Sequence, residues 1–194
     1  MAAGTLTLRD AVVGRSSFAR TLAVIVGGAG LIAACAQISI PLSFTPVPIT
    51  GQTFAVLLVG TSLGTVAGTA STLLYIAAGA IGAPVYAGHA HGWHVLNSAS
   101  GGYLVGFVFA AALSGFLAER RWDRRFSSSI GVMLSGNVVI YVFGVLWLKH
   151  VLHANLPTAL EDGLYPFVLG DTIKLYLAAA ALPAAWKLAG RGER

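Results

Sequence analysis

The chain has 194 residues, of which 56% are hydrophobic and 10% are charged, and its mean hydropathy is +0.78. A soluble domain carries about a quarter charged residues, and a soluble fold of this size would leave the apolar excess exposed to water. These values exclude a soluble enzyme and predict an integral membrane protein. The net charge of +5 does not indicate a nucleic-acid partner, because the basic residues are sorted as in membrane proteins.

Apolar stretches recur along the chain at the length of membrane spans, since a spanning helix needs about 20 mostly apolar residues. We expect an all-α integral membrane protein with one compact bundle of six transmembrane helices. The single membrane domain, 1–194, would hold a cytoplasmic amino-terminal segment (1–17), the bundle (18–188) and a cytoplasmic tail (189–194). The expected helices are Phe18–Ile40, Ile49–Ser62, Thr65–Ile81, Gly101–Ala118, Ile130–Leu148 and Tyr165–Leu188. No removable signal peptide is expected, because no small-residue cleavage pattern ends the first apolar stretch.

The second expected helix is short for a full span, so the second and third could instead form a partly re-entrant hairpin. Either arrangement leaves the sorting of basic residues unchanged, and cytoplasmic loops carry the excess of lysine and arginine. Both termini are therefore expected in the cytoplasm, and the cluster 119–125 is interpreted as a membrane-surface anchor. The basic residues on that side are Arg9, Arg15, Arg20, Arg120, Arg121, Arg124, Arg125, Lys187, Arg191 and Arg194.

Three irregular segments fall on the opposite, outer side of this topology. They are the proline-rich stretch Pro41–Pro48, the long loop Pro84–Ser100, and the start of the last helix around Gly170 and Asp171. Irregular backbone at membrane depth is tolerated where it lines a cavity. These segments therefore predict a pocket that opens to the outside.

Asp171 and Lys174 are charged residues inside an otherwise apolar helix, and their spacing places them on one face. Charged groups at membrane depth are costly, so they face the bundle interior and pair or bind a ligand. Lysine supplies three donors and ionised aspartate only accepts, which suits a ligand with a carboxylate and N–H groups. The alternative is an ion pair that only orients the helix.

Further polar and aromatic residues are candidates for the same pocket. Gln52 opens the second helix and could contact ligand, or cap a helix or bond between helices. Tyr86 could stack on a ligand, or lie in the interfacial aromatic belt. Asn97, Ser98 and Ser100 precede the fourth helix and could bind ligand near its amino end, or cap it.

Three histidines, His89, His91 and His94, lie close together in the outer loop. Histidine clusters can bind zinc, nickel or cobalt, but no cysteine or carboxylate stands nearby. We interpret them as a solvated loop and expect neither a resident metal nor a cofactor.

The first helix carries small residues at Ala29, Gly30, Ala33 and Ala34. Such a stripe permits close contact with another helix, either inside the bundle or on a separate membrane partner. The chain holds no G-x-x-x-x-G-K-[ST] motif, so it does not bind ATP through a P-loop. An intramembrane enzyme is disfavoured, because no histidine falls within an expected membrane helix to activate a serine such as Ser135.

Four segments carry a more specific signal: Ala36–Leu42 with Phe44–Thr53, Gly79–Gly88, Gly101–Phe107 and Gly170–Lys174. Together and in this order they resemble the BioY family, the biotin-binding substrate components of energy-coupling-factor transporters. The resemblance runs from the first helix to the last. It departs from the family pattern at 98–100, where Gly-Pro-Thr is usual, and at Tyr86 and His89, where Phe and Gly are usual.

The resemblance implies a six-helix bundle that binds biotin with high affinity near its outer surface and supports biotin uptake. It assigns ligand binding to Asp171 and Lys174, which match the family's Asp and Lys on the last helix. It also implies a transmembrane coupling subunit and cytoplasmic ATPase subunits as partners, in the bacterial cytoplasmic membrane, although some family members look able to act without them. A transporter component for another vitamin or a metal ion is the alternative, and a homo-oligomer is a further option.

Overall fold

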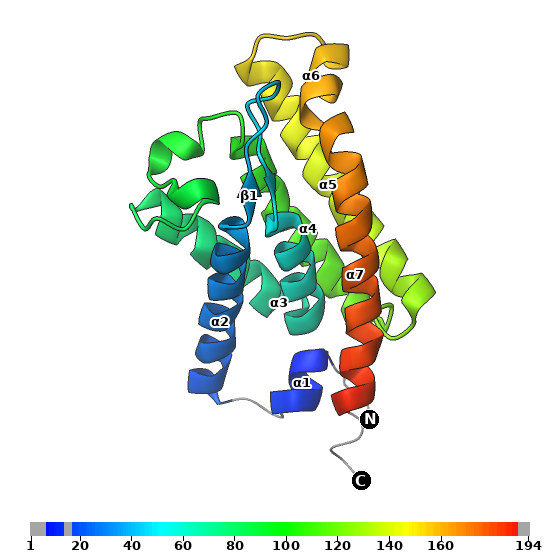
Figure 1. Ribbon diagram of the computed structural model, residues 1–194. Coiled ribbons are helices and arrows are strands. Elements are labelled where there is room, and N and C mark those ends of the chain that lie inside the picture. The colour runs from blue at the N-terminus through cyan, green and yellow to red at the C-terminus, as the bar shows by residue number, and fades with distance from the viewer. Residues whose placement is uncertain (1–6, 14–16, 190–194) are drawn as a thin grey trace.

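The computed structural model describes residues 7–13 and 17–189, so the predictions for Arg15, Arg191 and Arg194 lie outside the described residues. Helices dominate it, and Figure 1 shows most of them running along a common direction. The elements are α1 (Leu8–Val13), α2 (Phe18–Ala36), β1 (Ser39–Ile40), β2 (Ile49–Thr50), α3 (Gln52–Ala80), the 3-10 turns η1 (Ala87–His89) and η2 (Trp93–Val95), α4 (Gly101–Glu119), α5 (Phe126–Val151), α6 (Leu156–Gly163) and α7 (Tyr165–Ala189).

Five of these helices, α2, α3, α4, α5 and α7, are long and apolar enough to cross a membrane. The all-α bundle is confirmed, but the described residues give five candidate spans rather than six. The difference lies in α3, which takes in both the second and the third expected helix. The first expected helix also ends earlier, at Ala36, because the chain turns there into the short strand β1.

The α3 helix is bent back on itself at Gly64, whose backbone is not helical (φ 84°, ψ 177°). Gln52 Nε2 donates to the hydroxyl of Tyr75, although a straight helix would separate these residues by about 35 Å. Both ends of α3 therefore lie at one end of the bundle. After the bend, Glu119 Oε1 accepts from the backbone N–H of Thr65 at 2.8 Å and satisfies a donor at the start of the returning half.

The segment between α2 and α3 forms a small antiparallel hairpin, in which Ser39 pairs with Thr50 and Ile40 with Ile49. Its proline-rich tip is bound to α6, because Thr45 Oγ1 donates to the carbonyl of Asp162 at 2.7 Å. Figure 1 shows this hairpin and α6 at one end of the molecule. We call this the cavity end.

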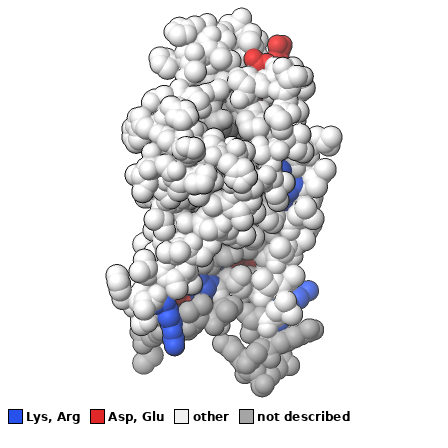
Figure 2. Space-filling view, turned by 60° about the vertical axis from the view of Figure 1, so that its left-hand side comes forward, with Lys and Arg blue, Asp and Glu red and all other residues white. Residues whose placement is uncertain are grey.

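The opposite end holds α1 and the last turns of α7, and we call it the basic end (Figure 1). The loop between α4 and α5 is tied to it, because Trp186 Nε1 donates to Asp123 Oδ2 at 2.6 Å. The guanidinium of Arg124 also lies 4.1 Å from the centre of the Trp186 ring. Figure 2 shows most of the visible lysine and arginine at this end, with a little acidic surface among them, an acidic patch at the other end, and one basic patch on an otherwise uncharged surface between them.

That uncharged surface is apolar. Large hydrophobic side chains on several helices are strongly exposed, including Val66 at 82% and Leu169 at 76%. Water would make such a surface unfavourable, whereas lipid accepts it. The protein is a multi-pass membrane protein. Its buried core consists of the close contacts between helices and of the site at the cavity end.

Candidate functional site

A cavity of about 330 Å³ lies at the cavity end, enclosed by the hairpin, the 83–100 loop and helices α3, α4, α5 and α7. This volume is in the range of small-molecule sites, which are mostly apolar with a few placed polar groups. Its apolar wall comes from Val47, Pro48, Ala87, Ala90, Val95, Leu104, Phe107, Ile140 and Phe167. Its polar lining comes from Thr50, Gln52, Thr53, Tyr86, His94, Ser98, Ser100, Tyr103, Tyr141, Asp171 and Lys174.

Asp171 and Lys174 project from one face of α7 into this cavity and form an ion pair, with 2.7 Å between Lys174 Nζ and Asp171 Oδ1. The ammonium group also donates to the backbone carbonyl of Thr50 at 2.7 Å, and lies 3.5 Å from Thr53 Oγ1. The lysine therefore fastens α7 to the start of α3. Since its charge is matched by Asp171, the pair adds no net charge to the cavity.

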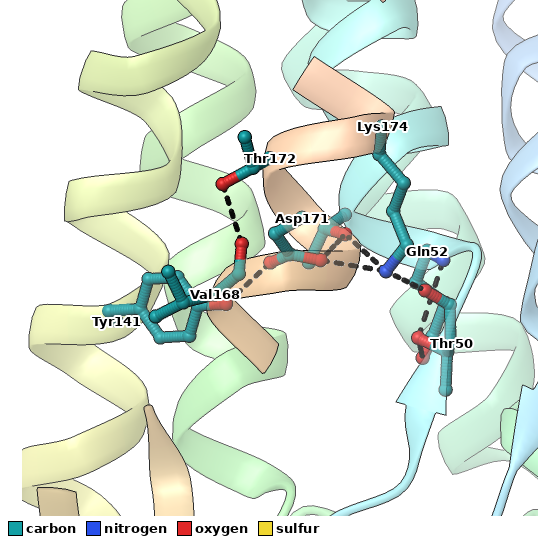
Figure 3. Close-up of polar contacts among 8 residues, drawn as sticks. Thr50, Gln52, Tyr141, Val168, Asp171, Thr172 and Lys174 are labelled. Atoms are coloured by element: carbon teal, nitrogen blue, oxygen red, sulfur yellow. Dashed lines mark hydrogen bonds and ion pairs between the residues drawn. The ribbon is translucent and has the colours of Figure 1, made fainter. Parts of the chain in front are cut away.

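Asp171 is the centre of the polar cluster, between Lys174 and Tyr141 in Figure 3. Its Oδ2 accepts from the Tyr141 hydroxyl at 2.5 Å, and its Oδ1 accepts from Thr53 Oγ1 at 3.2 Å. Its side chain is only 7% exposed. An ionised carboxylate can accept about four hydrogen bonds and three are made here, so it retains capacity for one N–H donor of a ligand.

A second polar group stands at the start of α3. Gln52 is buried, its Nε2 donates to the Tyr75 hydroxyl, and its Oε1 accepts from Thr50 Oγ1 at 2.9 Å. These bonds fix which side of the amide is the donor. Gln52 lines the cavity with Asp171, and its Nε2 carries a second N–H.

Tyr86 contributes an aromatic wall from the loop. Its hydroxyl donates to the carbonyl of Ile76 at 2.6 Å, and its ring packs edge-on against Tyr75 with 5.6 Å between ring centres. Burial raises the pKa of the Tyr86 hydroxyl above its ordinary value, so the group stays a neutral donor. The side chain is 2% exposed and is therefore a fixed part of the cavity wall.

Most residues predicted for the pocket do line one cavity, namely Asp171, Lys174, Tyr86, Gln52, Ser98 and Ser100. Asn97 does not line it and is exposed, because the turn at η2 directs it away. Sequence reasoning missed the contributions of Thr50 and Thr53. Tyr141 also belongs to the cavity, where its hydroxyl donates to Asp171.

The three loop histidines do not form one site. His94 lines the cavity, whereas His89 lines a neighbouring depression beside the hairpin tip. Within residues 7–13 and 17–189, no group of three or more His, Cys, Asp or Glu side chains is placed to hold a metal ion.

The small residues of α2 divide between two faces. Ala29 is buried in the bundle core and Ala33 packs against that core, whereas Gly30 and Ala34 are exposed. Ala29 therefore takes the alternative of packing inside the bundle, because the helix turns it inward. Gly27 is also exposed and shares the side of the helix that carries Gly30 and Ala34.

Comparison with known proteins gives one consistent result. The family model for the BioY family matches residues 7–191. The chain is 41% identical over 149 residues to a biotin transporter BioY of Thermotoga maritima, covering 77% of this chain and 85% of that protein. It is 37% identical over 155 residues to a probable biotin transporter BioY of Pyrococcus horikoshii, covering 80% and 87%.

A solved structure agrees with these sequence relatives. The crystal structure of an S-component for biotin from an ECF-type ABC transporter superposes with a TM-score of 0.78 at 29% identity. The match covers 87% of this chain and 92% of that one. The similarity therefore extends over most of the fold.

Proposed function

Because this chain belongs to the BioY family, we propose that it binds biotin in the cavity and serves biotin uptake as the substrate-binding component of a membrane transporter. It is a transport protein and not an enzyme. The observation that carries the proposal is the Asp171–Lys174 pair, which faces a cavity of ligand size beneath the loops. No cofactor is required for this role.

The donor and acceptor pattern of the cavity suits the ureido ring of biotin. The remaining acceptor capacity of Asp171 matches a ureido N–H, and the second N–H of Gln52 matches the ureido carbonyl. A neutral ion pair also fits a neutral ureido group better than it fits a carboxylate. The apolar wall formed by Leu104, Phe107 and Phe167 suits the fused ring and the aliphatic tail.

The carboxylate of the ligand then lies at the loop side of the cavity. Ser98, Ser100 and His94 come from that loop and line the cavity there. Lys174 is an unsuitable partner for the carboxylate, because its ammonium already binds Asp171 and the carbonyl of Thr50. Of the ligand groups expected for the pair, a carboxylate and N–H groups, this assignment keeps the N–H groups.

We further infer a single membrane domain with six crossings and with the basic end in the cytoplasm. The bend at Gly64 lies beside Glu119 and Thr7 at the basic end, whereas Gln52 and Tyr75 lie at the cavity end. This supports counting the two halves of α3 as two short crossings. The basic residues at one end support its cytoplasmic location, which reporter fusions to each terminus would test.

The partners proposed for uptake are a transmembrane coupling subunit and cytoplasmic ATPase subunits, since the sequence has no P-loop of its own. The exposed face Gly27, Gly30 and Ala34 on α2 allows close approach of a partner helix. Purifying the chain from membranes that contain such subunits would test this. A second copy of the chain on the same face is the other outcome, and cross-linking through cysteine at position 30 would detect it.

Biotin binding to the purified protein tests the central proposal. Isothermal titration should give saturable binding of biotin, and of dethiobiotin because it keeps the ureido group. Biotin amide should bind nearly as well, since the carboxylate is not held by the ion pair. Absence of biotin binding to correctly folded protein would refute the proposed ligand.

A further inference from the structure

The side chain of Gln37, just after α2, reaches into the loop that walls the cavity. The two N–H groups of its Nε2 are shared among three carbonyls, those of Ala33 at 3.0 Å, Val85 at 3.2 Å and Tyr86 at 3.3 Å. Its Oε1 accepts from the backbone N–H of His89 at 3.1 Å. One amide therefore joins the end of a membrane helix to both sides of the turn at Tyr86.

The other hydrogen bonds of this turn lead to α3 or stay within the loop. The Tyr86 hydroxyl is held by the carbonyl of Ile76, and the ring lies against Gly79, where a Cβ atom would come within 2.3 Å of it. The backbone N–H of Tyr86 donates to the carbonyl of Ala90 inside the loop. The ring is thus anchored to α3, whereas Gln37 is the side chain that anchors the backbone of the turn to α2.

The turn also has a conformation that needs support. Gly88 and His89 both have positive φ, at 63° and 61°. Glycine adopts this conformation at no steric cost, but histidine does so only when the surroundings hold it. The His89 N–H bonds directly to Gln37, so the same amide stabilises the least favourable residue of the turn.

We propose that Gln37 is a positioning residue that holds the 85–89 turn closed over the ligand cavity, so that its hydrogen bonds set how slowly ligand escapes. The proposal rests on the proposed function, because the retained ligand is biotin. Gln37 itself does not line the cavity; it acts through Tyr86, which does. Opening of the turn breaks the contacts at Val85, Tyr86 and His89 together. These hydrogen bonds therefore act as one unit, which we call the Gln37 bridge.

Two substitutions separate the donor side of the amide from its acceptor side. Gln37→Met keeps the shape and removes both, so biotin should dissociate roughly tenfold faster, the change expected for about one lost net hydrogen bond. The association rate should change little. Gln37→Glu keeps the oxygen that accepts from the His89 N–H, but it places a second oxygen opposite the carbonyls that Nε2 contacts. It should therefore speed biotin dissociation while the His89 amide stays protected from hydrogen exchange. Asn97→Ala is the matched control, because it removes an exposed amide from the same loop.

Hydrogen exchange at the His89 amide gives a readout that does not need ligand. Exchange should be faster in Gln37→Met than in the wild type, and biotin should slow it further in the wild-type protein itself. Wild-type release rates in both variants, or no effect of biotin on exchange at His89, would overturn the proposal. If the wild type binds no biotin, the proposed function fails, and accelerated exchange in Gln37→Met still establishes the bridge separately.

Discussion

The ion pair on α7 allows stability and binding to be separated by a double-mutant cycle. Lys174→Met leaves Asp171, whose side chain is 7% exposed, without its cation. Removing one member of a buried pair costs about 3–5 kcal/mol in free energy of unfolding. We expect the lower part of this range, because Thr53 and Tyr141 still donate to the carboxylate. Asp171→Asn should cost less, since the Lys174 side chain is 21% exposed and keeps the Thr50 carbonyl.

The double variant Asp171→Asn with Lys174→Met removes both charges. Its stability should return to within about 2 kcal/mol of the wild type, because no uncompensated charge remains. Its affinity should not return, since a hydrogen bond to a charged group is worth about 1.5–3 kcal/mol, or roughly 10- to 150-fold in Kd. Thermal unfolding in detergent measures the first effect and titration with biotin the second. Wild-type affinity in the folded double variant would refute the role given to the pair.

Three further substitutions have outcomes that follow from the surroundings of the residue that is changed. Gly64→Ala should lower the free energy of unfolding by about 1–3 kcal/mol, because φ of 84° with ψ of 177° is accessible almost only to glycine; chemical denaturation measures it. Gly79→Ala should displace the Tyr86 ring and weaken biotin binding, which titration would detect, with a stability cost of about 1–3 kcal/mol. Burial raises the pKa of Asp123 above its ordinary 3.8, and the Trp186 hydrogen bond offsets only part of this. The folded protein then keeps a proton that the unfolded chain loses, so stability falls as pH rises from about 4 through the raised pKa. Asp123→Asn should abolish that fall in unfolding temperature.

Hydropathy predicted the positions of the long helices well, because lipid exposure leaves a continuous apolar signal. It placed the break near Gly64, but it could not tell whether two short apolar halves count as one span or two. It also gave no sign of α6, which has eight residues and is too short and polar to resemble a span. The early end of α2 is another miss, since Ile38 and Ile40 extend the apolar run although the backbone has already turned.

The site residues that could be predicted from sequence are those whose side chains are energetically unfavourable in an apolar membrane segment. Asp171 and Lys174 stand out because lipid-depth sequence seldom carries charge. The Thr50 carbonyl that binds Lys174 has no sequence signature, because every residue has one. The exposure of Asn97 could not be foreseen either, since the direction of its side chain depends on a 3-10 turn.

The burial of Asp171 explains why the site uses a neutral pair rather than a single charge. Its side chain is only 7% exposed, and a lone charge there would lack solvation. Paired with Lys174, the carboxylate keeps its full acceptor strength while the empty cavity stays neutral. A ligand then gains a hydrogen bond to a charged group without the protein having to bury an unmatched charge first.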